Sequence, residues 1–131
     1  MLRFEKTSVI KATPADLYRF FLDPGNLAKI SPEDFHVTEL NAALPLTLGA
    51  EFSLKAEVGG AKFVWSGRIL VLDPPKRIVD EQVRGPFKRF VHTHQFRGID
   101  NHTFLIDEIE YQPRFGPLAA LVDKYVIRPR L

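Results

Sequence analysis

Two histidines, His92 and His94, lie two residues apart in the stretch GPFKRFVHTHQF, residues 85–96. Residues at this spacing point to the same face of an extended strand, so both imidazoles would face one way. Imidazole changes charge near neutral pH and is also a common metal ligand. The pair could therefore do acid–base chemistry or hold a metal ion, depending on the groups that other elements bring to the same face.

A carboxylate beside these rings would favour acid–base chemistry. Asp107, in the stretch FLIDEIEY, lies among apolar residues. Burying an unpaired charge is costly, so this carboxylate needs a partner such as a histidine, Arg114 or Tyr111. A carboxylate can also fix the tautomer of a catalytic histidine. The sequence therefore marks His92, His94 and Asp107 as candidate catalytic residues for acid–base chemistry on a carbonyl substrate.

Two other interpretations of the histidines remain open. As metal ligands, the pair would need Asp107 or Asp80 as a third ligand. Two histidines without a clear third and fourth ligand are a weak metal pattern, so no metal and no other cofactor is predicted. The plainest interpretation is structural, with each ring packing against aromatic neighbours and forming a hydrogen bond with a nearby group.

Two predicted strands carry these residues. Alternation along 88–97 places both histidines on the face of Phe90 and Phe96. Along 103–112, Asp107 shares a face with three apolar or aromatic residues, while the other face includes two glutamates. The glutamate face is therefore predicted to be the wet one.

Further strands and turns follow from period-two patterns and glycines. Gly59-Gly60 predicts a two-residue hairpin turn, because both positions tolerate positive φ. Gly67 interrupts the returning strand and predicts a bulge or a site of close approach. The other strands are predicted over 2–10, 51–58, 63–71 and 78–83.

Three helices are predicted. Thr13 can cap a helix that should stop at 23–25, and a second short helix should run from Asn26 to Ile30. Apolar residues at helical spacing from Leu118 to Val126 predict a final amphipathic helix. Together the patterns predict an α+β fold with a single domain over residues 1–131, in which a curved antiparallel sheet wraps around the C-terminal helix.

Aromatic side chains fall on one face of several predicted strands. They could stack on a ring-containing ligand, although aromatics at strand spacing more often fill a core. The candidate ligand-binding residues are Phe52, Phe63, Trp65, Phe87, Phe90, Phe96 and Tyr111.

Composition limits the classes of protein. The chain has 131 residues, 45% of them apolar, and no cysteine, which suits one domain without disulfides. Its net charge is +2, but basic and acidic residues are interleaved, so no nucleic-acid partner is predicted. No apolar run resembles a signal peptide or a membrane span, so we expect a cytoplasmic protein without integral membrane association. These patterns predict no particular oligomeric state.

Three stretches carry a resemblance to a known family: IKATPADLYRFFLDPGNLAKISP, DEQVRGPFKRFVHTHQF and FLIDEIEYQPRFGPLAAL. Together they resemble the START-like, helix-grip superfamily, in its SRPBCC group of polyketide cyclase/dehydrase and lipid-transfer proteins. The resemblance implies a sheet that grips a long C-terminal helix around a cavity for an apolar or amphipathic small molecule. The final helix departs from the family pattern, because Pro129 ends it early.

The leading functional prediction is the binding of a lipid-like or polycyclic, polyketide-like molecule in that cavity. Desolvation of the ligand would supply most of the affinity, and a few polar groups would orient it. The alternatives are a cyclase or dehydratase that uses the histidines with Asp107 or Asp80, and a protein-interaction module with an exposed apolar patch.

Overall fold

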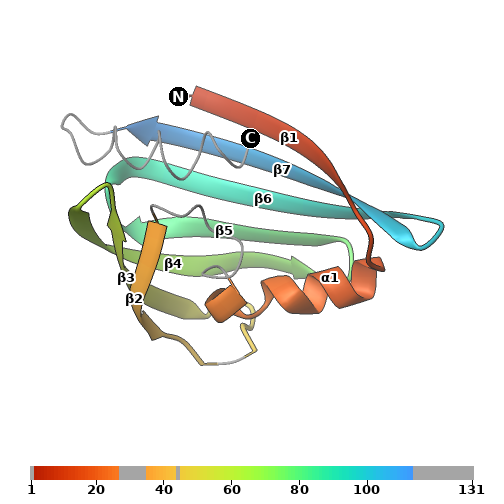
Figure 1. Cartoon of the computed structure of the whole chain (residues 1–131), viewed down its shortest axis with the longest axis horizontal. Helices are drawn as coiled ribbons and strands as arrows, with labels where there is room; N and C mark the ends of the chain where they lie inside the picture. Colours follow the sequence, from red (N-terminus) through yellow and green to blue (C-terminus); the bar gives the residue numbers. More distant parts are fainter. Residues whose placement is uncertain (1, 27–34, 44, 114–131) are drawn as a thin grey trace.

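A computed structural model describes residues 2–26, 35–43 and 45–113 of the chain. These residues form one curved antiparallel sheet of seven strands in the order β1-β7-β6-β5-β4-β3-β2, with a helix lying across it (Figure 1). The strands are β1 (Leu2–Ile10), β2 (Phe35–Asn41), β3 (Glu51–Val58), β4 (Ala61–Asp73), β5 (Arg77–Arg84), β6 (Phe87–Ile99) and β7 (His102–Pro113).

Helix α1 (Pro14–Phe21) begins where the sequence predicts. Thr13 Oγ1 accepts a hydrogen bond from the backbone N–H of Asp16 at 3.3 Å, and Pro14 occupies the first turn. Tyr18 is buried, and its ring meets Phe96 of β6 edge-on, with a centroid distance of 5.3 Å. The apolar side of α1 therefore packs on the sheet and defines its inner face.

Only part of the predicted helical structure falls within the described residues. A 3-10 turn, η1 (Pro24–Asn26), follows α1. The second short helix predicted from Asn26 to Ile30 lies, beyond Asn26, outside the described residues. The final helix predicted from Leu118 to Val126 lies wholly outside them. No helix in the described ranges is long and apolar enough to cross a membrane.

The glycine predictions for β3 and β4 are confirmed. Gly59 and Gly60 have φ of 53° and 82° and form the two-residue turn between the strands. The pairing of β4 with β5 shifts between Ser66 and Gly67, which is the expected bulge. The ring of Phe52, opposite Gly67 on β3, occupies the place where a Cβ at Gly67 would stand, so a larger residue at this position would displace the ring.

The inner face of the sheet carries two separate apolar groups. The first, named here the aromatic cluster, consists of Leu54, Ala56, Val58, Phe63, Phe87, Phe90, Ile109 and Tyr111. The second, the helix-side cluster, consists of Leu17, Tyr18, Leu46, Ile69, Ile78, Phe96 and Leu105.

The outer face of β7 is wet, as the sequence predicts. Glu108 forms an ion pair of 3.0 Å with Arg3 of β1, and Glu110 is exposed. Leu105, Ile109 and Tyr111 are buried on the opposite side. Asp107, which alternates with the glutamates, therefore faces inward.

Candidate functional site

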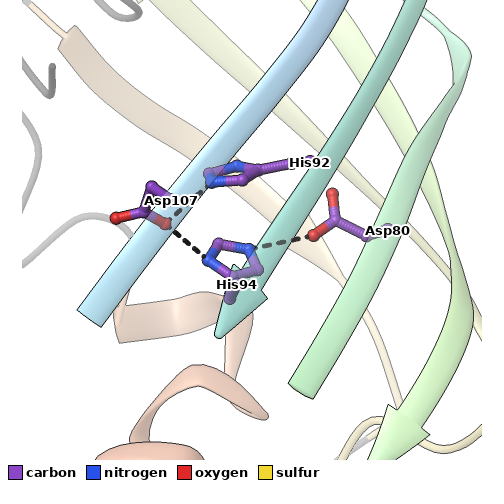
Figure 2. Close-up of polar contacts among 4 residues, drawn as sticks. All are labelled: Asp80, His92, His94 and Asp107. Carbon is purple, nitrogen blue, oxygen red and sulfur yellow. Dashed lines mark hydrogen bonds and ion pairs between the residues drawn. The ribbon is translucent and has the colours of Figure 1, made fainter. Parts of the chain in front are cut away.

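Three adjacent strands bring four ionisable side chains together on the inner face. Asp80 of β5 lies opposite His92 of β6, and Asp107 of β7 lies opposite His94. Directly opposed residues of antiparallel strands share a face, and so do residues two apart on one strand. Figure 2 shows the resulting group, named here the His–Asp cluster: Asp80, His92, His94 and Asp107.

Hydrogen bonds connect the whole His–Asp cluster. Oδ1 of Asp107 lies 2.9 Å from His92 Nε2 and 2.9 Å from His94 Nδ1. The other ring nitrogen of His94, Nε2, lies 3.2 Å from Oδ2 of Asp80 (Figure 2). His94 therefore stands between two carboxylates, and Asp107 connects the two rings.

The geometry favours His94 as an imidazolium. A neutral imidazole has one N–H, but both nitrogens of His94 face carboxylate oxygens at hydrogen-bond distance. Burial alone would lower the pKa of His94. The hydrogen bonds from Asp107 and Asp80, with the charges of these carboxylates, outweigh it and raise the pKa to about 9. His94 thus donates from both nitrogens at neutral pH.

His92 has the opposite protonation. Burial and the positive charge of His94 lower its pKa below the ordinary value, and the hydrogen bond to Asp107 compensates only in part. The two imidazole rings stack with centroids 3.7 Å apart, so a second positive charge there would be strongly repelled. His92 is therefore neutral at pH 7, with its proton on Nε2 facing Asp107 and a lone pair on Nδ1.

Asp107 has the histidine partners that its burial demands. Burial raises the pKa of its carboxyl, but the hydrogen bonds and charges of His92 and His94 prevail and hold that pKa well below its usual range. The expectation that Asp107 pairs with a histidine, Arg114 or Tyr111 is thus met by both histidines. The carboxylate remains ionised across the physiological range.

Two aromatic rings pack against the His–Asp cluster, and a lysine lies opposite it in the sheet. Phe21 of α1 stacks on His94 with a centroid distance of 5.2 Å, and Phe90 meets His92 edge-on at 6.3 Å. Lys6 of β1 is half-buried and lies opposite Asp107 in the sheet register. The four side chains of the cluster retain only 12–18% exposure. The cluster is thus a confined polar site between the two apolar clusters.

The seven predicted ligand-binding aromatics divide between the two apolar clusters. Five are buried, and only Phe52 and Trp65 are half-buried. Phe63, Trp65, Phe87, Phe90 and Tyr111 belong to or pack against the aromatic cluster, whereas Phe52 and Phe96 lie in or against the helix-side cluster. The His–Asp cluster lies between these two sets. Their ligand-binding role stays a prediction.

The sequence undervalued Asp80 and missed Phe21. The sequence offers Asp80 only as an alternative to Asp107, as a metal ligand or beside the histidines in catalysis, yet it forms one of the two hydrogen bonds that fix His94. Its alternation with the buried Ile78 was the available signal. The stacking of Phe21 on His94 depends on where α1 crosses the sheet, for which the sequence has no local signal.

The same residues could hold a metal ion. Asp80, His92 and His94 each offer one ligand atom, and these atoms lie within 4.8 Å of one another. A metal on Nε2 of His94 would have to replace the proton that this atom shares with Asp80. The hydrogen bond between His94 Nε2 and Asp80 already gives each of these two side chains a partner, so the contact between them is explained without a metal ion.

A separate pocket opens at the β2 side of the sheet. It is an open depression lined by residues that include Asn41, Glu51, Ser53, Ser66 and Arg84, together with Phe52 from the predicted ligand-binding set. None of these residues belongs to the His–Asp cluster. The cavity predicted between the sheet and the C-terminal helix involves residues outside the described part of the chain, so it stays a prediction.

Comparisons with known proteins agree on the fold. The family model described as "Polyketide cyclase / dehydrase and lipid transport" matches residues 10–129. Protein CV1439 from Chromobacterium violaceum is 23% identical with a TM-score of 0.72, and the match covers 96% of this chain and 92% of that one. The Zhui aromatase/cyclase from Streptomyces sp. R1128 is 18% identical with a TM-score of 0.74, covering 98% and 88%.

A plant protein has the same architecture. Ginseng major latex-like protein 151 from Panax ginseng is 14% identical with a TM-score of 0.70, and the match covers 96% of this chain and 90% of that one. The curated protein sequences contain no significant match. At these identities the structural similarity establishes the fold, a large antiparallel sheet with a helix of the START-like helix-grip type, which agrees with the sequence resemblance.

Proposed function

Because the chain belongs to the polyketide cyclase/dehydrase and lipid transport family, we propose that the inner face of its sheet binds an apolar or amphipathic small molecule, lipid-like or polycyclic. One observation carries the proposal. The His–Asp cluster is a small, partly exposed polar site between two apolar clusters on a single face. Ligand sites typically have this composition, an apolar lining with a few well-placed polar groups.

The two kinds of surface would have separate tasks. Contact with the apolar clusters would remove ligand surface from water and supply most of the affinity, at roughly 25 cal/mol per Å² of apolar area. The His–Asp cluster would fix the position of one polar group of the ligand. The similarity in fold to a protein named as an aromatase/cyclase is consistent with a small-molecule ligand.

Trp65 provides a direct test of binding. It is the single tryptophan of the chain, is half-buried, and lies against Phe90 with a centroid distance of 4.8 Å. We expect its fluorescence to change saturably when the protein is titrated with testosterone as a polycyclic probe or decanol as a chain probe. Native mass spectrometry of freshly purified protein should show whether a co-purified molecule must first be removed.

Two variants locate the binding on the inner face. Phe52→Ala shortens a half-buried inner side chain and should weaken probe binding several-fold. Val64→Ala changes a residue that is 44% exposed on the outer face of β4 and should leave binding unchanged. Absence of any binding, or equal losses in both variants, would count against the proposal.

Acid–base catalysis is the second candidate function. A neutral imidazole and an imidazolium stacked in one site are a base and an acid held at different pKa values, which favours such chemistry. His92 Nδ1 would accept an α proton from a carbonyl substrate. Both N–H groups of His94 are already engaged with carboxylates, so the cluster has no free donor for the enolate oxygen. Binding is therefore the better supported function.

Exchange of α protons would detect catalysis without knowledge of the natural substrate. 2-Tetralone in D₂O would lose an α proton to His92, and the imidazole, after exchange with solvent, would return a deuteron to the carbanion. We expect His92→Phe to abolish any protein-dependent exchange seen by NMR, while His36→Gln, an exposed change on β2, preserves it. Exchange that survives in His92→Phe would exclude His92 as the base.

A further inference from the structure

The His–Asp cluster uses all its ring N–H donors in internal hydrogen bonds and retains unused acceptors. The cluster has three ring N–H groups, and each points to a carboxylate: His92 Nε2 and His94 Nδ1 to Asp107, and His94 Nε2 to Asp80. All the polar side-chain atoms that remain are acceptors, namely Nδ1 of His92 and the second oxygen of each carboxylate. A ligand that reaches this site meets acceptors and no uncommitted N–H of the cluster.

We infer that the ligand of this inner face carries a neutral hydrogen-bond donor, such as a phenol, enol or alcohol, at its polar end, and that fatty acids and other carboxylates are disfavoured. This inference rests on the proposed function and names the ligand class for the same site. The acceptor that would receive the donor is Nδ1 of His92, because Asp107 fixes the ring proton on the other nitrogen.

The net charge of the cluster also favours a neutral ligand group over a carboxylate. Asp80 and Asp107 are two carboxylates and His94 is one imidazolium, so the cluster carries an excess negative charge. A ligand carboxylate would face this excess in a partly buried site, where like charges repel more strongly than in water. A hydroxyl brings no charge and supplies the missing donor.

Lys6 is a nearby cationic residue that could attract an anionic ligand. It lies opposite Asp107 on β1 and is half-buried, although none of the ion pairs found among the described residues includes it. Its ammonium would moderate the negative charge of the cluster. A test of ligand class therefore needs a variant in which Lys6 is neutral.

The protonation pattern can be tested without a ligand. In a long-range ¹H–¹⁵N spectrum of labelled protein at pH 7, we expect His94 to show two protonated nitrogens and His92 to show a proton on Nε2 only. Assignment follows from His92→Phe and His94→Gln, since the chain has four histidines. A proton on Nδ1 of His92, or a neutral His94, would overturn the inference and leave the proposed binding function intact.

Matched probes test the ligand class. Isothermal titration calorimetry would compare 2-naphthol, 2-methoxynaphthalene and 2-naphthoate at pH 7, and decanol, methyl decyl ether and decanoate as the chain series. Within each series we expect the hydroxyl compound to bind about five- to tenfold more tightly than the ether, the equivalent of one neutral hydrogen bond, and the carboxylate to bind most weakly.

Variants connect the preference to His92. His92→Phe keeps a ring in place and removes Nδ1, so hydroxyl and ether should bind with nearly equal affinity, while His36→Gln should keep the preference. Equal binding of hydroxyl and ether by the unaltered protein overturns the inference alone. Tighter binding of the carboxylate by the unaltered protein also overturns the inference, and its loss in Lys6→Gln would assign that binding to the ammonium of Lys6. Failure of both series to bind at all would overturn the proposed function and the inference together.

Discussion

The aromatic cluster and the His–Asp cluster lie on the same face of the sheet and share strands β6 and β7, but different interactions hold them together. Phe90 of the first and His92 of the second are two residues apart on β6, and Tyr111 and Asp107 likewise share β7. The aromatic cluster contains rings such as Phe87 and Tyr111, which pack with a centroid distance of 5.4 Å, and its stabilisation comes mainly from the burial of apolar surface. In the His–Asp cluster each polar contact joins a ring nitrogen to a particular carboxylate oxygen.

This difference suggests separate roles: the aromatic cluster stabilises the fold, and the His–Asp cluster provides specificity for a ligand. Apolar burial is proportional to area and tolerates rearrangement, so the aromatic cluster contributes most to folding. Burying two carboxylates and an imidazolium carries a desolvation cost that their mutual attraction offsets only in good geometry. A protein selected for stability alone would gain little from the His–Asp cluster. Its presence on an apolar face is consistent with recognition of a polar group.

Truncation within the aromatic cluster should give the largest effect. Phe87 is fully buried between Phe90 and Tyr111. Phe87→Ala should lower the free energy of unfolding by about 3–5 kcal/mol, because it removes apolar contacts and leaves a cavity. Urea denaturation followed by circular dichroism would measure the change. Val64→Ala, at an exposed position of β4, should change it by less than about 0.5 kcal/mol.

Removal of one charge from the His–Asp cluster should have the next largest effect. Asp107→Asn keeps the shape of the side chain but leaves the imidazolium of His94 with a single carboxylate, so we expect a loss of about 2–3 kcal/mol in urea denaturation. Glu108→Gln is the matched control. It changes the adjacent carboxylate, which faces outward to Arg3, and should cost less than about 1 kcal/mol. Similar losses in the two variants would mean that the inner cluster has no special energetic role.

The features that the sequence predicted best depend on neighbouring residues. The cap at Thr13 and the turn at Gly59-Gly60 involve contacts over a few positions, so composition and spacing suffice to find them. Alternation likewise assigned His92, His94 and Asp107 to the correct faces, because the side-chain period of a strand is two. These local rules predicted which face each group occupies.

Contacts between strands were harder to predict because they depend on register. The hydrogen bond from His94 to Asp80 requires the alignment of β5 with β6, and β5 is itself aligned to β4 through two shifts, one of them at Gly67. Each shift moves the pairing by a residue, which a count along the sequence does not show. The contact of Phe21 with His94 depends in addition on the path of α1 across the sheet.

Alkaline pH should weaken the contribution of the His–Asp cluster to stability and leave that of the aromatic cluster unchanged. The pKa of His94 is raised to about 9 in the folded protein, so its contribution to stability is complete below the unfolded pKa of about 6.5 and is lost as pH rises to 9. The lowered pKa of Asp107 acts at the other end, since its contribution is present above about pH 4 and lost as pH falls.

We therefore expect the free energy of unfolding to fall by roughly 2 kcal/mol between pH 6.5 and 9. Urea denaturation at a series of pH values would measure the fall. His94→Gln removes the titrating ring and should give a nearly flat profile over the same range, whereas Phe87→Ala should keep the slope at a lower overall stability. An equal slope with and without His94 would show that its imidazolium does not stabilise the fold.

Within the His–Asp cluster, the smallest effect on stability should come from His92, the residue proposed to select the polar group of the ligand. His92 is neutral and donates one hydrogen bond to Asp107, which still accepts from His94 when His92 is replaced. His92→Phe loses that bond and gains apolar contact with Phe90, so we expect a change of no more than about 1 kcal/mol. The same variant should abolish the preference for hydroxyl over ether probes, because only His92 offers a free ring acceptor. A large loss of stability with the preference retained would reverse this division and make His92 a structural member of the cluster.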